Sequence, residues 1–573
     1  MHKISALVTT TAMIALIGGC AGNKPIPAPP QVEAAPQPPA PLPPPPPPPP
    51  VAAAMDASKY GAMPSPVVRG RMNDYPAKIA NERGVAPPPR YIPPVMVATD
   101  PGRERYDGKE VSPVHVVRQE PVSTFSVDVD TGAYANMRRH ISAGQMPPKD
   151  SVRTEELINY FRYDYVLPLS KGAPFSVNTD MMVTPWNAET RLLRIGLRGY
   201  DIPRTSRPPA NLVFLVDVSG SMNSPDKLPL VKTALAGLAG ELGAKDKVSI
   251  VVYAGAAGMV LEPTNDERKI RGALDRLSAG GSTAGGAGLQ LAYQIARDNF
   301  IDGGVNRILL ATDGDFNVGV SDTKALIQMV EKQRDTGITL TTLGFGQGNY
   351  NEAMMEQVAD HANGNYSYID SALEAKKVLG DEMGSTLFTI AKDVKIQVEF
   401  NPSQVSQYRL LGYENRALRE EDFNNDKVDA GDIGASHQVT AIYEIVPAGT
   451  KGWVGPRRYE DVSPVEEARG RSSELAFVKL RYKLPDGTTS RLIERPVGNM
   501  MLWQKMAPSA DFKFAVAVAG FGQKLRGDPL MGNYSFANLR QLAGSPGDYW
   551  RQEFVKLIGV AQGLEGGRRA PEE

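Results

Sequence analysis

The sequence predicts an α/β protein whose central part is a mostly parallel sheet with helices on both faces, flanked by a β-rich unit and C-terminal helices. Three observations predict this: apolar strands and amphipathic helices alternate between residues 209 and 385, strand-like segments lie on both sides, and helical patterns close the chain. Such alternation builds a parallel sheet because each helix carries the chain back to start the next strand. At 573 residues, the chain is too long for one ordinary core.

The first 20 residues form a predicted secretory signal. They have a basic start, an apolar stretch and small residues before Cys20. The ending LIGGC resembles a bacterial lipobox, which implies cleavage before Cys20 and a lipid on that residue; Ala21 in place of Asp implies the outer membrane. The alternative is an ordinary signal peptide with a chance cysteine. Because Cys20 is the only cysteine, the chain can form no internal disulfide and no thiolate metal site.

Residues 21–115 are predicted to be a disordered, proline-rich linker. Its first part includes the run PPPPPPPP, which favours extended polyproline II and cannot build a core. The lipid would hold the chain at a membrane, and the linker would hold the folded part away from it. No later segment is a continuous apolar span long enough to cross a bilayer.

The charge balance excludes one class of partner. Lys plus Arg (63) nearly equals Asp plus Glu (64), so the composition has no basic excess of the kind that marks nucleic-acid binding or an affinity for anionic membranes. We therefore expect no nucleic-acid partner.

The central segment, residues 209–385, shows the alternation most clearly. Its strands are continuous apolar runs, as expected for strands buried on both faces, and its helices have apolar residues at helical spacing. The expected strands are 211–218, 246–255, 307–315, 338–346 and 366–369, with a short edge strand at 259–263. The expected helices are 228–242, 267–277, 289–300, 323–335, 351–362 and 372–383.

Polar side chains gather in three loops at strand ends. Asp217, Ser219 and Ser221 lie in DVSGS, Thr283 in GGSTAGG, and Asp313 in ATDGD. The carboxyl ends of parallel strands meet at one sheet edge, where such folds bind ligands. Carboxylates and hydroxyls without imidazole or thiolate suit a hard cation, and few protein charges suit Mg²⁺, with Mn²⁺ or Ca²⁺ as alternatives. Alone, DVSGS is more typical of a helix N-cap; the three loops together favour a metal site.

This order of motifs resembles the metal-ion-dependent adhesion site of a von Willebrand factor type A domain, a Rossmann-like fold. The resemblance covers residues 209–385 and implies that Ser219 and Ser221 bind Mg²⁺ directly. It also implies that Asp217 and Asp313 act through water, and that Thr283 engages when a partner's carboxylate completes the shell. The flanks resemble those of an uncharacterised bacterial group of envelope lipoproteins. These resemblances imply a membrane-anchored, non-enzymatic binding protein that holds a protein partner, in adhesion or envelope assembly.

An aspartic-protease-like or other hydrolase that uses Asp130 is the alternative function. Asp130-Thr131-Gly132 follows an apolar strand, and a second Asp-Thr-Gly begins at Asp335; such a site needs two carboxylates that share a proton. The second copy follows a helical segment, so Asp130 is more simply interpreted as the N-cap of the next helix.

The segments on either side of the central domain are rich in strands. The N-terminal flank, 116–208, has strand patterns at 175–185 and 190–200. The C-terminal flank, 386–573, has four such patterns and then helices at about 511–526, 535–543 and 548–563. Because short hairpins are marginal alone, we expect the two flanks to form one β-rich unit with the central domain inserted between them.

Overall fold

A computed structural model describes residues 104–567, apart from gaps at 128–129, 170–171, 283–284, 315–322, 349, 456–472 and 503–506. The described residues all belong to one compact unit that spans Pro94–Glu573. Cys20, the linker up to residue 103 and Thr283 lie outside the described residues.

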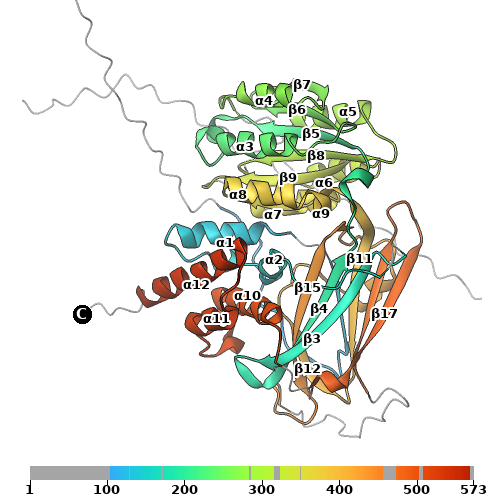
Figure 1. Ribbon diagram of the computed structural model, residues 1–573, viewed down its shortest axis with the longest axis vertical. Helices are drawn as coiled ribbons and strands as arrows, with labels where there is room; N and C mark the ends of the chain where they lie inside the picture. Colours follow the sequence, from blue (N-terminus) through green and yellow to red (C-terminus); the bar gives the residue numbers. More distant parts are fainter. Residues whose placement is uncertain are drawn as a thin grey trace, which may run out of the picture. The chain divides into compact units, whose positions relative to one another are not determined.

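The central segment forms a six-stranded sheet in the order β10-β9-β8-β5-β6-β7 (Figure 1). All neighbours are parallel except β6 and β7. The prediction of a mostly parallel sheet with a short edge strand is therefore confirmed, and the structure shows that this edge strand, β7, is antiparallel. The strands are β5 (Ala210–Asp217), β6 (Lys247–Tyr253), β7 (Ala257–Thr264), β8 (Val305–Thr312), β9 (Thr339–Phe345) and β10 (Tyr366–Ile369).

Helices cover both faces of this sheet, because alternate residues of each strand point to opposite sides. In β5, Leu212, Phe214 and Val216 join the core formed with α3, α4 and α8, whereas Val213 and Leu215 join the core formed with α5, α6 and α7. The helices are α3 (Leu228–Ala239), α4 (Glu267–Asp275), α5 (Gly285–Asp298), α6 (Thr323–Arg334), α7 (Glu352–His361), α8 (Ala372–Lys376) and α9 (Met383–Leu387).

The flanks form two further sheets, in the orders β1-β12-β15-β4-β3 and β13-β2-β11-β16-β17. β4 precedes the central domain and β15 follows it, yet they pair directly, with Ile195 opposite Ala441. Phe400 of β11 stacks on Tyr408 of β12 between the two sheets, with ring centroids 4.4 Å apart. One β-rich unit therefore combines strands from both flanks, as expected. The strands are β1 (His115–Val116), β2 (Val122–Ser126), β3 (Phe175–Thr184), β4 (Asn187–Gly199), β11 (Thr389–Phe400), β12 (Val405–Leu410), β13 (Ala417–Leu418), β14 (Ile433–Gly434), β15 (Gln438–Pro447), β16 (Glu474–Lys483) and β17 (Ser490–Gly498).

A helical cluster packs against β4 and β15. Leu192 and Ile442 of these strands join its core. The ring of Phe161 lies 4.9 Å from that of Phe514 and 5.6 Å from that of Phe554. The three predicted C-terminal helices are therefore present. The cluster consists of α1 (Gly132–Ser142), α2 (Thr154–Asn159), α10 (Ala510–Arg526), α11 (Phe536–Ala543) and α12 (Tyr549–Gly567).

The predicted linker extends too far toward the C-terminus, because its last residues are bound to the folded unit. Glu104 is ion-paired with Arg139 and accepts a hydrogen bond from the backbone of Gly348. The backbone N–H of Arg105 donates to the carbonyl of Tyr350. These contacts are polar, so apolar periodicity could not reveal them.

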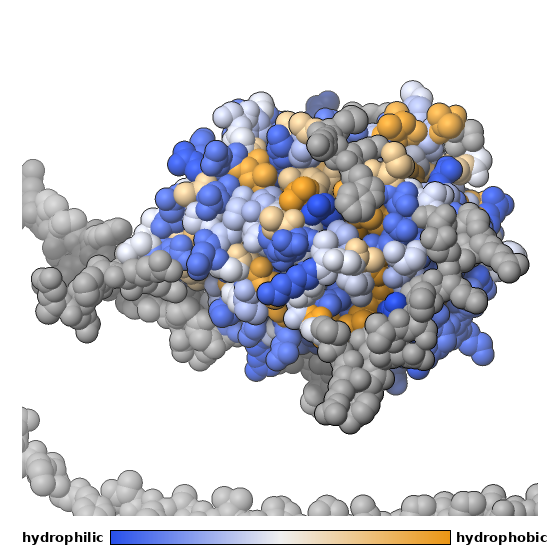
Figure 2. All heavy atoms as spheres, turned by 90° about the horizontal axis from the view of Figure 1, so that it is seen from below, coloured by the Kyte–Doolittle hydropathy of each residue, from blue (hydrophilic) through white to orange (hydrophobic). Residues whose placement is uncertain are grey.

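The surface of the described part is mixed in character. Figure 2 shows hydrophobic side chains interspersed with polar ones on the face that it presents, rather than one broad apolar patch. Among the described residues, no helix is both long and apolar enough to cross a membrane.

Candidate metal centre

The first loop brings two serine hydroxyls together beyond the end of β5. Asp217 is the last residue of the strand, and its Oδ1 accepts a hydrogen bond of 2.8 Å from the backbone N–H of Ser219. This Asp-to-i+2 bond is the usual way in which an aspartate shapes a tight turn. The short helix η5 (Gly220–Asn223) follows, and the hydroxyl oxygens of Ser219 and Ser221 lie 3.0 Å apart. Ser219 is buried and Ser221 is exposed, so the pair lies at the surface of the site.

The second oxygen of Asp217 is held by the neighbouring strands. The Tyr253 hydroxyl at the end of β6 and the Thr312 hydroxyl at the end of β8 each donate to Oδ2 at 3.2 Å. Asp217 is 0% exposed. Burial raises the pKa of this carboxyl, the charge of Asp313 adds to the rise, and the hydrogen bonds from Ser219 and Thr312 oppose it. Asp217 therefore does not lie at an exposed strand end, as its position before a loop would suggest, because the ends of β6 and β8 enclose it.

The third loop carries an ion pair that the motifs do not reveal. Asp313 directly follows β8, and its Oδ2 accepts a hydrogen bond of 2.8 Å from the ammonium group of Lys227, which precedes α3. Both side chains are buried. The stem of Lys227 fills the space beside Gly346, where a Cβ would come within 2.3 Å of it. Lys227 belongs to none of the three loop motifs, so the sequence does not indicate that it pairs with Asp313.

The glycine-rich second loop lies directly against the first. The backbone N–H of Gly220 donates to the carbonyl of Gly281, and that of Gly280 donates to the carbonyl of Val218. Gly281 has φ +86°, a conformation that a residue with a side chain rarely adopts. These bonds place the described start of the loop at the serine pair; Thr283 follows two residues later, outside the described residues.

The residues present fit a hard cation, and they fit it with oxygen atoms alone. Asp217, Ser219, Ser221 and Asp313 all lie at the carboxyl edge of the sheet, as their positions in the sequence predict. Within the described residues, no three His, Cys, Asp or Glu side chains are arranged to hold a metal. An ion here would therefore depend on hydroxyls and water as well as on the two carboxylates.

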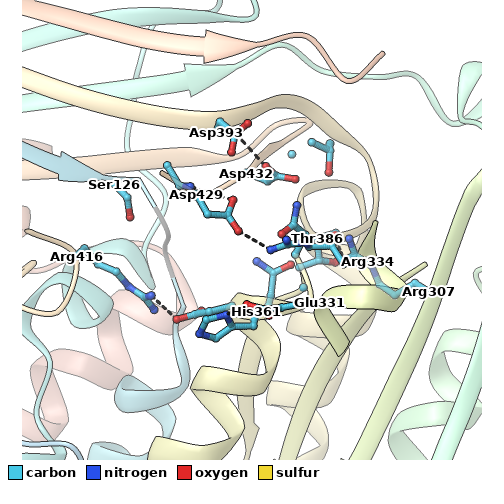
Figure 3. Close-up of a pocket in the computed structure, with 18 of the residues that line it drawn as sticks. Ser126, Arg307, Glu331, Arg334, His361, Thr386, Asp393, Arg416, Asp429 and Asp432 are labelled. Atoms are coloured by element: carbon cyan, nitrogen blue, oxygen red, sulfur yellow. Dashed lines mark hydrogen bonds and ion pairs between the residues drawn. The ribbon is translucent and has the colours of Figure 1, made fainter. Parts of the chain in front are cut away.

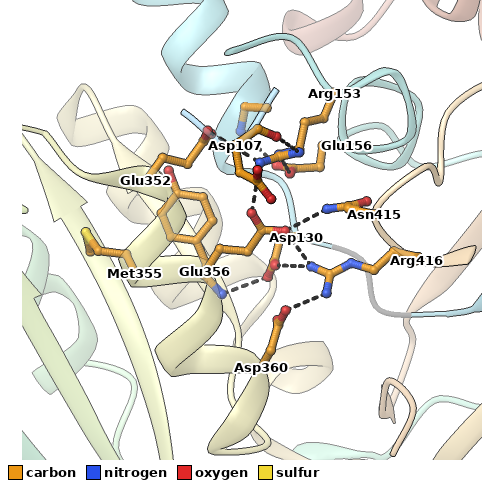
Figure 4. Close-up of polar contacts among 12 residues, drawn as sticks. Asp107, Asp130, Arg153, Glu156, Glu352, Met355, Glu356, Asp360, Asn415 and Arg416 are labelled. Carbon is orange, nitrogen blue, oxygen red and sulfur yellow. Dashed lines mark hydrogen bonds and ion pairs between the residues drawn. The ribbon is translucent and has the colours of Figure 1, made fainter. Parts of the chain in front are cut away.

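Asp130 has a structural role, and Figure 4 shows its carboxylate facing Arg416. Its Oδ1 accepts a hydrogen bond of 2.7 Å from the backbone N–H of Tyr366, and its Oδ2 is paired with Arg416 at 3.0 Å. Tyr366 begins β10, an edge strand whose outer N–H groups have no strand partner. The N-cap interpretation of Asp130 is wrong, because Thr131 occupies that position and Glu156 binds the N–H of Ala133 in the first turn.

The second Asp-Thr-Gly copy does not complete a catalytic pair with Asp130. Asp335 follows α6 on a turn, its side chain is 71% exposed, and it is ion-paired with Arg334. Asp130 is only 2% exposed, and Tyr366 and Arg416 occupy its two oxygens. A protease dyad would instead need two carboxylates close enough to share one proton.

Next to Asp130, buried carboxylates outnumber the cations that face them (Figure 4). Glu352, the first residue of α7, is 0% exposed, and its oxygens have no hydrogen-bond partner among the described residues. Arg153 lies 3.8 Å away. Burial raises the pKa of Glu352 to about 8; Arg153 opposes this shift, whereas Glu356, Glu155 and Asp107 add to it. A neutral Glu352 is therefore the form that this interior accommodates.

Three family models match the chain. Residues 211–381 match the model described as von Willebrand factor type A domain, residues 100–194 match von Willebrand factor, and residues 385–564 match the C-terminal part of the uncharacterized protein YfbK. Together with the sheet order and the three loops, these matches define a protein built around a von Willebrand factor type A domain.

The chain belongs to the YfbK family. It is 47% identical over 477 residues to the uncharacterized protein YfbK of Escherichia coli K12, which covers 81% of this chain and 82% of that relative. It is also 34% identical over 187 residues to the uncharacterized protein sll0103 of Synechocystis, covering 32% of this chain and 43% of that relative. Among solved structures, a von Willebrand factor type A protein from Catenulispora acidiphila aligns with a TM-score of 0.38 and 15% identity, over 70% of this chain and 91% of that one.

Proposed function

We propose that this protein is a lipid-anchored, non-enzymatic binding protein of the cell envelope that holds a protein partner through a Mg²⁺-dependent site. The observation that carries the proposal is the pairing of the Ser219 and Ser221 hydroxyls, 3.0 Å apart, beside the enclosed carboxylate of Asp217. These are hard oxygen ligands at the sheet edge where such folds bind ligands.

Each residue has a distinct role in this proposal. The two serine hydroxyls and Thr283 contact the ion, and Asp217 and Asp313 hold its water ligands. The hydrogen bonds from Tyr253 and Thr312 fix the Asp217 carboxylate, as outer-shell partners do in metal sites. When bound, the ion supplies a positive charge and an open position for an acidic side chain of the partner.

Lys227 supplies a positive charge beside Asp313. Its ammonium group is 2.8 Å from the carboxylate, and both are buried. A buried carboxylate without such a partner would be costly. The same lysine repels an incoming cation, so we propose that it lowers the affinity of the site for Mg²⁺.

The anchor is proposed from the sequence. A lipid on Cys20 attaches the chain to a membrane, by resemblance the outer membrane, and the proline-rich linker separates it from the folded unit. Changing Cys20 to Ser is expected to release the full chain from the membrane fraction. Membrane retention equal to that of the unchanged protein would contradict the anchor.

Affinity capture from an envelope extract tests the binding function. The full chain is used as bait in Mg²⁺ and in EDTA, beside a Ser219→Ala, Ser221→Ala double variant. The matched control is Asp246→Asn, a half-buried carboxylate at the opposite end of β5 that binds the N–H of Ala210. We expect partner recovery only in Mg²⁺ and only with intact serines. Equal recovery in EDTA would contradict a metal-dependent contact and would bring the hydrolase alternative back into consideration.

A further inference from the structure

A second site candidate lies at the other end of the central sheet. A polar cavity of about 550 Å³ is present there, in the size range of small-molecule sites (Figure 3). Residues of the central domain and of the β-rich unit line it together. From the former come Arg307, Arg334 and His361, and from the latter Asp393, Asp429 and Asp432.

Arg307 brings a buried charge without a counter-ion to this polar cavity. It is 3% exposed, and its guanidinium donates to the hydroxyls of Thr339 and Thr341 and to the carbonyl of Thr386. All three acceptors are neutral, and no carboxylate of the described residues lies within ion-pair distance of it. Because an unpaired buried charge is costly, the position favours binding of an anion.

Asp432 brings the opposite charge to the same cavity. It lies between η7 (Glu420–Asn424) and β14 and is half-buried. Its carboxylate accepts one long hydrogen bond of 3.3 Å, from the backbone N–H of Asp393. No cation of the described residues forms an ion pair with it. Two pairs of charged groups at the cavity are formed by Arg334 with Asp429 and by Asp393 with Lys483.

The pKa values of the two groups agree with this picture. Burial lowers the pKa of Arg307 to about 10, and Asp432 opposes that shift from a distance. Burial also raises the pKa of Asp432 to about 7; Lys392 opposes this rise, whereas Asp393 and Asp429 add to it. Each group therefore lacks a close partner of opposite charge, although both face one cavity.

We propose that the polar cavity binds a small zwitterionic amino-carboxylate, such as a free dipeptide, with its carboxylate on Arg307 and its ammonium group on Asp432. One ligand then supplies both missing partners. The side chains of Asn363 and Asn365, which also line the cavity, offer donors and acceptors to a peptide group. Because Arg307 belongs to the central domain and Asp432 to the β-rich unit, the ligand bridges the two.

This site is separate from the proposed metal centre. Arg307 is the third residue of β8, and Asp313 directly follows the last residue of that strand. At the usual rise per residue of a strand, the two residues lie about 20 Å apart. Binding of the zwitterion should therefore not depend on divalent metal. The two proposals can fail independently.

Calorimetric titration of the full chain with alanyl-alanine tests the proposal. We expect saturable binding that is the same in Mg²⁺ and in EDTA. N-acetyl-alanyl-alanine lacks the ammonium charge and alanyl-alanine amide lacks the carboxylate, so each should bind at least about tenfold more weakly, the usual loss for one charge-assisted contact. These capped peptides leave the protein unchanged, so no folding defect can explain their result.

Two variants then assign the contacts. Asp432→Asn should weaken the binding of alanyl-alanine about tenfold and leave the binding of N-acetyl-alanyl-alanine unchanged. Arg307→Gln should also weaken the binding of alanyl-alanine about tenfold, but it should leave the binding of alanyl-alanine amide unchanged. The matched controls are Asp486→Asn and Arg491→Gln, both exposed and outside the cavity. The proposal is overturned if alanyl-alanine does not bind at millimolar concentration, or if both capped peptides bind as tightly as alanyl-alanine. It is also overturned if Asp432→Asn leaves the binding of alanyl-alanine unchanged. Such results would mean that Arg307 and Asp432 merely offset each other across the cavity.

Discussion

Replacing Asp217 separates its structural role from its proposed metal role. Its carboxylate accepts three hydrogen bonds, from the N–H of Ser219 at 2.8 Å and from the hydroxyls of Tyr253 and Thr312 at 3.2 Å each. Asp217→Ala leaves three buried donors without this acceptor, at about 1 to 3 kcal/mol for each one that stays unpaired. The substitution also removes a desolvated charge, which offsets part of that destabilisation. We expect the free energy of unfolding to fall by about 2 to 4 kcal/mol.

Asp217→Asn should behave differently. Its carbonyl oxygen still accepts the bond from Ser219, and its amide can donate to the two hydroxyls. We expect a loss of about 1 kcal/mol or less, together with loss of the stabilisation that Mg²⁺ gives to the unchanged protein.

Urea unfolding of the full chain, in Mg²⁺ and in EDTA, measures both effects. Asp246→Asn serves as the control, and it should keep the response to Mg²⁺. An unfolding midpoint of Asp217→Ala equal to that of the unchanged protein would refute the hydrogen-bond argument. Stabilisation of Asp217→Asn by Mg²⁺ to the normal extent would refute the metal assignment.

Three further predictions concern buried charges. For Glu352, the pKa is raised in the folded state, so the free energy of unfolding should fall as pH rises from about 4.5 to about 8; Glu352→Gln should flatten this slope and be more stable at pH 8 by about 1 to 3 kcal/mol. Parallel pH profiles for the two proteins would count against this. Lys227→Met should raise the affinity of the site for Mg²⁺ about tenfold, since it removes a positive charge beside Asp313. An unchanged or weaker affinity in a Mg²⁺ titration would contradict the proposed repulsion between Lys227 and the ion. Asp130→Ala should lower the urea midpoint, because it leaves the N–H of Tyr366 and the charge of Arg416 without their partner; a hydrolase would instead lose an activity at unchanged stability.

The sequence by itself was sufficient for the features that depend on local patterns. Apolar runs and helical spacing predicted the central sheet and its helices, including the edge strand β7; its antiparallel direction came from the structure. The same patterns predicted the three C-terminal helices. The order of DVSGS, GGSTAGG and ATDGD predicted that Asp217, Ser219, Ser221 and Asp313 meet at one sheet edge, because parallel strands bring their carboxyl ends together.

Only the tertiary structure decided which partners the charged side chains have. Lys227 reaches Asp313 across 86 positions of the chain, and Arg416 reaches Asp130 across 286. No periodicity records such contacts, because a single charged residue has the same appearance in the sequence whether it is solvated or buried. For the same reason, the burial of Asp217 and the lack of an ion-pair partner for Arg307 and Asp432 among the described residues became visible only in the fold. Local patterns fix which face of an element is apolar, whereas the partner of a buried charge depends on which elements the whole chain brings together.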